Sequence, residues 1–267
     1  MIRSDCEQGS EIWHNLRAGK LTGSEFGKVM GTTDHKRVRI IGAEPEEGFG
    51  RAKAQEAAFI ELIQAGDTGK IKSEVEASGG LPGLLAKGLI EETTDSTGCT
   101  LRRSAAAKHI DLLVARTRFT PAELGEFIGT DATDRGNYLE GPSGVEFENE
   151  TGITIERVGF VMHEDLNLVG VSPDGMTSDG GVFETKSLLP QNHLTVVRNR
   201  RVPSCYKAQV HGQMAVAGVN HCWFQAYCPE LPTVRIKVER DAYTENLFKC
   251  LVEFEQMYIN QLESYGL

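Results

Sequence analysis

The chain has 267 residues, which is enough for one large domain with a sizeable core. It carries 28 Lys and Arg against 38 Asp and Glu, a net charge of −10, and 40% of its residues are hydrophobic. These values exclude disorder throughout, and the acidic balance argues against a protein that coats nucleic acid by bulk charge. No apolar run approaches the ~20 residues of a membrane span, and the start lacks the apolar stretch of a signal peptide, so we expect a cytoplasmic protein.

The cysteines favour the same compartment. No CxxC pair occurs, and the spacing suits neither a disulfide framework nor a zinc or iron–sulfur site. We therefore predict free thiols in a reducing cytoplasm. The six positions are Cys6, Cys99, Cys205, Cys222, Cys228 and Cys250.

The N-terminal third contains two different kinds of sequence. Apolar spacing over 11–31 predicts a short helix, a break and a second helix, with Ser24 as the N-cap of the second. Residues 32–100 contain ten glycines, and we interpret them as an inserted, partly helical segment. Within that segment, 51–65 predicts a helix and 94–98 a loop.

The remaining elements follow in a regular order. A helix is predicted over 101–116, and Thr120 followed by Pro121 resembles a helix start. From residue 153 the apolar period changes to two, which is typical of strands. The order of helices and strands predicts an α/β fold with a central mixed sheet flanked by helices. The later elements are strands over 153–164, 166–176, 180–188, 221–228 and 233–239, with helices over 205–218 and 241–262.

Three polar residues stand on the predicted second and third strands. Asp174 ends one strand, and Glu184 and Lys186 lie two apart on the next, so their side chains share one face. Two carboxylates at one end of a hairpin would repel unless a cation lies between them, and such oxygen ligands suit Mg²⁺ or Mn²⁺. A neighbouring lysine can orient or deprotonate a water molecule. The alternative is a surface turn followed by a strand with solvated charges.

The spacing of these residues is that of the PD-(D/E)xK nuclease signature, and further motifs accompany it. In order along the chain, they make it resemble the phage lambda exonuclease group, also called YqaJ-type viral recombinases. That resemblance implies a restriction-endonuclease-like core and one nuclease domain over 1–267. The blocks are Glu7–Gly9 with Trp13–Glu25, Arg135–Glu140 with Phe147 and Thr151–Gly152, Ser172–Gly175 with Glu184–Lys186, and Tyr206–Val210.

The resemblance implies a role for each matching residue of the catalytic centre. Asp174 and Glu184 would be metal ligands, with the Thr185 carbonyl as a third, and Lys186 would hold the attacking water. Glu140 would complete the metal site from the preceding helix. From the following helix, Gln209 would face the active centre.

Glu140 is followed directly by Gly141 and Pro142, which would disturb a helix running straight through. The helix is then expected to start after Glu140, leaving Glu140 on a turn. In that arrangement Glu146 or Glu148 would compete for the metal site.

The resemblance also implies a DNA-binding surface. Arg17 and Ser24 match positions that hold the 5′-phosphate, where a guanidinium fork and a helix N-terminus suit an anion. Trp13 is interpreted as a core anchor rather than a base-stacking platform. A basic run over 197–201 and the start of the next helix are also predicted to contact DNA. For the run, the alternative is a solvated loop. These residues are Arg198, Arg200, Arg201, Tyr206 and Lys207.

Together these features predict a Mg²⁺-dependent deoxyribonuclease, with Mn²⁺ as a substitute metal. By resemblance it would be a 5′→3′ exonuclease on double-stranded DNA ends in phage-type homologous recombination, in a bacterial or phage-infected cell. The resemblance also implies a homo-oligomer and a single-strand annealing protein as partner. The alternatives are a structure-specific or nicking endonuclease of the same fold, and a non-catalytic DNA-end-binding scaffold.

Overall fold

The computed structural model describes residues 1–40, 90–125 and 131–267. The predicted helix over 51–65 lies outside these residues, and the prediction of one domain with an inserted segment over 32–100 stays a prediction. The chain divides into two compact units, one of Met1–Thr33 with Thr97–Leu267 and one of Asp34–Ser96.

A two-stranded sheet contains the described residues of the second unit. Its strands are β3 (Met30–Ile40) and β4 (Ile90–Leu101). The loop predicted over 94–98 is wrong, because these residues lie within β4. Thr94 and Thr97 are β-branched and suit a strand, and pairing with β3 outweighs the turn-forming residues between them.

The N-terminal elements are short. Ser10 caps the first helix by accepting a hydrogen bond from the Trp13 amide. Ser24 lies inside a 3₁₀ turn, so its predicted N-cap position is wrong. The second helix is a single turn because Met30 begins a strand. The elements are β1 (Ile2–Ser4), α1 (Glu11–Arg17), β2 (Leu21–Thr22), η1 (Gly23–Glu25) and α2 (Phe26–Val29).

Two helices precede the strand-rich region. The helix predicted over 101–116 is confirmed as α6 (Arg103–Arg116). At Thr120 the interactions of a capping box form, since the Thr120 amide donates to Glu123 at 2.8 Å, but 121–125 make turns rather than a helix. The next helix, α7 (Asp131–Thr151), runs through Pro142.

The strands of the first unit form two sheets rather than the single one expected. The predicted strand over 153–164 breaks into β5 and β6, which join different sheets. The break contains Gly159, where a Cβ atom would lie 2.1 Å from the Cys6 carbonyl oxygen, so only glycine fits this close approach. One sheet has the order β11-β10-β9-β8-β5 and the other β1-β6-β7-β2. The new strands are β5 (Ile155–Glu156), β6 (Phe160–Met162), β7 (Val169–Val171), β8 (Gly175–Thr177), β9 (Val182–Ser187), β10 (His221–Tyr227) and β11 (Val234–Glu239).

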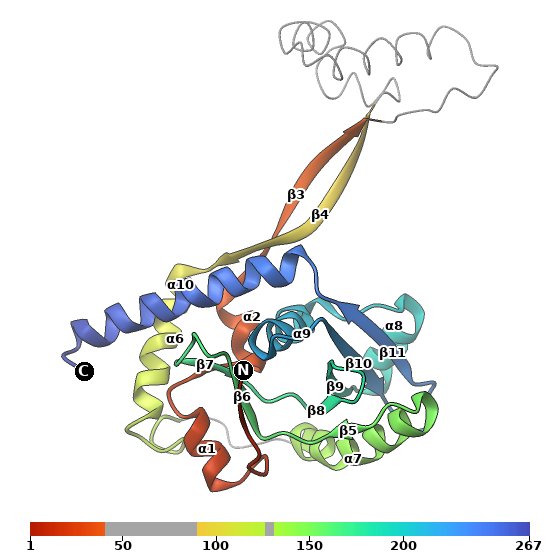
Figure 1. The fold of residues 1–267 in the computed structure, drawn as a ribbon, viewed down its shortest axis with the longest axis horizontal. Helices are drawn as coiled ribbons and strands as arrows, with labels where there is room; N and C mark the ends of the chain where they lie inside the picture. The colour runs from red at the N-terminus through yellow and green to blue at the C-terminus, as the bar shows by residue number, and fades with distance from the viewer. Residues whose placement is uncertain (41–89, 126–130) are drawn as a thin grey trace, which may run out of the picture. The chain divides into compact units, whose positions relative to one another are not determined.

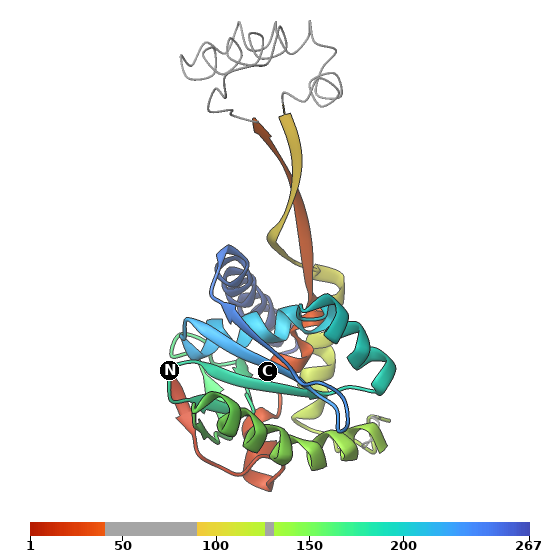
Figure 2. The same cartoon turned by 90° about the vertical axis from the view of Figure 1, so that its right-hand side faces the viewer.

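Helices cover both faces of the five-stranded sheet, which is mixed because β9 and β10 are parallel and the other pairs antiparallel (Figures 1 and 2). Along β9, Phe183 meets Phe147 of α7. Glu184 instead accepts hydrogen bonds from α9 (Ser204–Ala217). The alternation of side chains along the strand thus directs Glu184 toward α9, while Thr185 forms a hydrogen bond with Ser143 of α7.

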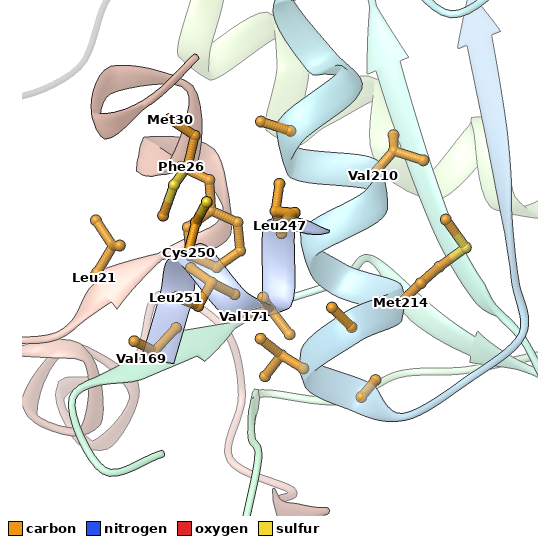
Figure 3. Packing of buried hydrophobic residues seen from close by; sticks show 14 of the residues in the cluster. Leu21, Phe26, Met30, Val169, Val171, Val210, Met214, Leu247, Cys250 and Leu251 are labelled. Atoms are coloured by element: carbon orange, nitrogen blue, oxygen red, sulfur yellow. The ribbon is translucent and has the colours of Figure 1, made fainter. Parts of the chain in front are cut away.

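The helices after β9 complete the core. The predicted helices over 205–218 and 241–262 are confirmed as α9 and α10 (Ala242–Ser264), and α9 ends at Gly218 in the left-handed conformation. The helix α8 (Pro190–Asn199) was not predicted, although Pro190 at its first turn is a helix-start signal. Figure 3 shows Phe26 among the buried side chains, and Gly212 of α9 leaves the space its ring fills.

Two further predictions concern the chain as a whole. All six cysteines are free thiols in the structure. Among the described residues, none of the helices has the length and apolar character needed to cross a membrane.

Candidate active site

Asp174 lies beside β9 because the β8–β9 hairpin folds back on itself. The residue follows β7 and directly precedes β8, where Gly175 pairs with Phe183. Its Oδ2 atom accepts a hydrogen bond of 2.7 Å from the Thr185 amide. The hairpin therefore places the aspartate next to the strand that carries Glu184 and Lys186, as the spacing predicted.

Glu184 is almost fully buried, with 1% of its surface exposed. Its Oε1 atom accepts hydrogen bonds from Lys186 and, at 2.6 Å, from Gln209. Its Oε2 atom accepts one from Gln213. Because a buried charge is costly unless it is hydrogen-bonded, these donors hold the carboxylate in one orientation.

The charges of the site act strongly on one another. Burial and the neighbouring Glu184 carboxylate raise the pKa of Asp174 well above its usual range, and Lys186 opposes this only in part. Burial alone would lower the pKa of Lys186, but the Glu184 and Asp174 carboxylates raise it above its usual value. Lys186 is therefore held as a cation that can donate a hydrogen bond, while Asp174 lacks a full counter-charge.

Glu140 comes to the same pocket from α7. Its side chain lines the pocket with Asp174 and Glu184, and it receives a hydrogen bond of 2.6 Å from Arg157. The expectation that the helix starts after Glu140 is wrong, because α7 continues through Pro142. Packing of α7 against β9 and β10 stabilises the helix across the position where proline removes a backbone donor.

The two competing glutamates have other partners. Glu146 accepts a hydrogen bond of 2.8 Å from Arg235, and Glu148 accepts one of 2.6 Å from the Ile155 amide. Neither lines the pocket that Asp174 and Glu184 share. The geometry therefore favours Glu140 as the third carboxylate.

Arg17 and Ser24 also line this pocket. The Arg17 guanidinium is 3.9 Å from the centre of the Trp13 ring and donates a 3.1 Å hydrogen bond to Ser172. Trp13 is half-buried and donates to the Gly159 carbonyl and to Ser172, so it is tied into the structure as an anchor. Burial lowers the pKa of Arg17 to about 10, which leaves it cationic at neutral pH.

The predicted DNA-contacting residues lie in different places. Tyr206 lines the pocket, with its ring centre 5.4 Å from the Lys186 ammonium. Lys207 lies instead over the Tyr243 ring, at 4.0 Å from its centre. Arg198 lies in the last turn of α8, whereas Arg200 and Arg201 lie in the exposed loop that follows it, and none of the three lines the pocket.

Sequence reasoning missed Gln213, although a signal for it was present. Gln213 lies four residues after Gln209 on α9, and residues at that spacing share one face of a helix. The residue is 1% exposed, and its Oε1 atom is buried with no hydrogen-bond partner. Ser172 and Gln8, both in the quoted motif blocks, also line the pocket.

The pocket has the chemistry of a divalent-cation site. Asp174, Glu184 and Glu140 supply hard oxygen atoms, and burial together with repulsion from Glu184 raises the pKa of Asp174, a cost that a cation would relieve. Gln213 adds a buried oxygen without a partner. Within the described ranges, no three His, Cys, Asp or Glu side chains already converge as a metal cluster, because Glu140 is turned toward Arg157. The residues thus fit a divalent cation, provided that the Glu140 carboxylate releases its hydrogen bond with Arg157 and turns toward the cation.

The two-sided mixed sheet and the Asp–Glu–Lys set on its hairpin define the PD-(D/E)xK class of nuclease fold. Residues 98–220 match the family described as the YqaJ-like viral recombinase domain, which confirms the resemblance found in the motifs. Among curated proteins, none matches the sequence.

Solved structures of an alkaline exonuclease agree with this fold. The alkaline exonuclease LHK-Exo from Laribacter hongkongensis superposes with a TM-score of 0.61 at 18% identity, with 96% of each chain covered. Its complex with dAMP gives 0.56 at 18% identity, covering 96% of this chain and 98% of that one. A phage-related exonuclease from Haemophilus somnus is 13% identical, with coverage of 95% and 99% and a TM-score of 0.48. The family match and the LHK-Exo fold support the prediction of a DNA exonuclease.

Proposed function

We propose that the chain is a Mg²⁺-dependent 5′→3′ exonuclease that acts on double-stranded DNA ends in phage-type homologous recombination. One observation carries the proposal. A single pocket of about 340 Å³ is lined by Asp174, Glu184 and Lys186 together with the cationic Arg17. Its volume lies near the lower end of the roughly 300–1,000 Å³ typical of small-ligand sites, which suits one terminal nucleotide.

The carboxylates of the pocket would hold the metal. Asp174, Glu184, Glu140 and the Thr185 carbonyl are the proposed ligands for Mg²⁺, or for Mn²⁺ as a substitute. A bound divalent cation supplies Lewis-acid stabilisation of the charge that develops on the phosphate. Gln209 and Gln213 fix the Glu184 carboxylate from α9, so its position does not depend on the ligand.

Lys186 has the charge and position to orient the attacking water. As a cation it donates a hydrogen bond to the water oxygen, which then forms a bond to phosphorus. The bond between phosphorus and the 3′ oxygen breaks, and the proton that the water loses is balanced by the proton that the 3′ oxygen takes up from solvent. The products are a nucleotide with a 3′-hydroxyl and a shortened strand with a new 5′-phosphate, which is again a substrate.

Arg17 and Ser24 would set the polarity by holding the terminal 5′-phosphate. Arg17 is suited to this role because Trp13 and Ser172 fix its guanidinium before any ligand binds. Ser24 is exposed on η1 and lines the same pocket, where its hydroxyl can donate to a phosphate oxygen. Binding the end of the strand at these two residues would leave the first internucleotide phosphate for the carboxylates.

Further DNA contacts, partners and location stay predictions. The exposed Arg198, Arg200 and Arg201, with Tyr206 and Lys207, would contact the DNA backbone. A homo-oligomer and a single-strand annealing protein are implied by the family resemblance, as is activity in the cytoplasm of a bacterial or phage-infected cell.

The decisive experiment is digestion of linear duplex DNA with either 5′-phosphate or 5′-hydroxyl ends, with Mg²⁺ and with a chelator. We expect release of mononucleotides from the 5′ ends, faster with the phosphate and absent without metal. Degradation from the 3′ ends, or full activity with the chelator, would contradict the proposal.

Two controls separate the alternatives. The Lys186→Ala variant should lose activity by about 10²-fold or more, whereas the matched Lys249→Ala change at an exposed position of α10 should have no effect. Closed circular duplex should stay intact, and its cleavage would indicate an endonuclease. Binding of ends with no cleavage in Mg²⁺ or Mn²⁺ would indicate a scaffold.

A further inference from the structure

A second and larger cavity adjoins the proposed phosphate-binding residues. Its volume is about 910 Å³, and it shares Arg17 and Ser24 with the carboxylate pocket. We call it the basic groove. One part of it is formed by α1 and the chain that follows through η1 into α2. The other part is formed by the end of α6 and the turn after it. Its lining includes Trp13, His14, Arg17, Lys20, Lys28, Glu25, Arg116 and Phe119.

The charge of the groove is opposite to that of the whole chain. Four Lys and Arg side chains line it against one carboxylate, that of Glu25, in a protein of net charge −10. Glu25 is 7% exposed and accepts hydrogen bonds from Arg116 at 2.8 Å and Lys28 at 3.3 Å. Burial would raise its pKa, but His109 and Arg116 lower it below the usual range, so it stays ionised inside the wall. The lining is therefore net positive.

Aromatic side chains accompany these charges. Phe119 is 53% exposed after the end of α6, and Trp13 lies in the same lining. A basic groove with an exposed ring is typical of single-strand binding, in which cations follow the phosphates and bases stack on aromatic faces. Phe119 thus offers an accessible ring in the same lining as the four cationic side chains.

We propose that the basic groove binds the single-stranded 5′ extension of a DNA end, an inference that rests on the proposed function. With a 5′ overhang, Arg17 contacts an internal phosphate, and the strand continues past it into the groove. The first cleavage then releases a short oligonucleotide with a 3′-hydroxyl and leaves a 5′-phosphate on the duplex strand. The chemistry is the same hydrolysis, with water as the only co-reactant.

The size and position of the groove favour a strand over a released mononucleotide. The carboxylate pocket of about 340 Å³ already suits one nucleotide, and the groove is more than twice as large. Because the two cavities share Arg17, one continuous strand can occupy both. A groove that retained the released mononucleotide would slow turnover, because the product would occupy Arg17 and Ser24, which must bind the next 5′-phosphate.

The test uses two duplexes that carry a radiolabelled 5′-phosphate, one blunt and one with a four-nucleotide oligo-dT 5′ overhang. The length of the first labelled product reports the position of the first cut. The blunt end should release labelled mononucleotide, and the overhang should release labelled di- to tetranucleotides. Mononucleotide as the first product from both ends would overturn the groove assignment while leaving the proposed function intact. No labelled product from the blunt end would contradict the proposed function itself.

Variants of the groove give an independent measurement. The double change Lys20→Ala with Phe119→Ala should lower kcat/KM on the overhang about tenfold and leave the blunt end unchanged. The slope of log affinity against log salt for the overhang should fall by about 0.7 for the lost lysine. Equal effects on both ends, or none on the overhang, would overturn the proposal.

The matched control is Lys249→Ala with Val252→Ala on α10, both exposed and outside the groove lining. It should leave both substrates unaffected. Lys20 is half-buried, and the other three positions are exposed to solvent. Substitutions at such positions change stability little, so a thermal melt of each variant should coincide with that of the parent.

Discussion

The carboxylate pocket and the basic groove are neighbours with opposite electrostatics. In the pocket, Asp174 and Glu184 lie close together, and the Lys186 ammonium forms an ion pair with Glu184. In the groove, cationic side chains outnumber the single carboxylate of Glu25. Arg17 belongs to both linings, so one guanidinium marks the boundary between a site that attracts a metal cation and one that attracts a phosphate strand.

This contrast shows what the net charge of −10 leaves open. An acidic chain can act on DNA when its negative charge is partly used for metal ligands and its positive charge is gathered beside them. The composition argues against coating of nucleic acid, but it does not argue against cutting it. Changes in the pocket should therefore affect the rate of hydrolysis, and changes at Arg17 should affect which DNA ends are used.

The largest effect is expected at Asp174. The Asp174→Asn variant should lose at least about 10³-fold in activity because a metal ligand is removed. Without metal, this variant should be more stable than the parent because the repulsion between the two carboxylates is gone. Each kcal/mol gained in the free energy of unfolding should raise Tm by roughly 2–4 °C. Activity assays and thermal melts with and without Mg²⁺ measure both quantities.

The pH dependence of that stability has a definite sign. The pKa of Asp174 is raised in the folded state, so its contribution is favourable at low pH and is lost as the pH rises from about 4 through the raised value. The stability gain of Asp174→Asn should therefore grow with pH. A gain that shrinks with pH would contradict the proposed repulsion, and Glu150→Gln at an exposed position of α7 is the control.

An intermediate effect is expected at the boundary. The Arg17→Lys variant keeps the charge but loses the two-pronged geometry, so the preference for 5′-phosphate over 5′-hydroxyl ends should fall about tenfold. The ratio of initial rates on the two substrates at fixed salt measures this. An unchanged ratio would show that Arg17 does not recognise the 5′-phosphate. The control is Arg118→Lys, at an exposed position.

The smallest effect is expected at Gln213, a positioning residue. The Gln213→Met change removes one donor to Glu184 while keeping a similar volume, so kcat should fall about fivefold with little change in KM. The Mg²⁺ concentration for half-maximal activity should rise, which a purely structural defect would not cause. Gln191→Met on the exposed face of α8 is the matched control.

The C-terminal half of the fold was predictable because its local signals agree. The period-two pattern and Gly218 specify β9 and α9, and Asp241 with Thr244 forms the capping box that starts α10. The loop predicted over 94–98 failed because strand pairing outweighed local turn propensity. The break at Gly159, which sends β5 and β6 to different sheets, depends on an approach to Cys6 that no local pattern reveals.

The candidate site divides in the same way. The sequence alone determined Asp174, Glu184 and Lys186 as a set, because hairpin spacing and strand alternation are local properties. Only the tertiary structure decided that Glu140 rather than Glu146 or Glu148 reaches this set, since packing on the sheet carries α7 through Pro142. The basic groove likewise arises where α1 and the end of α6 meet, and residues that distant in sequence are brought together only by folding.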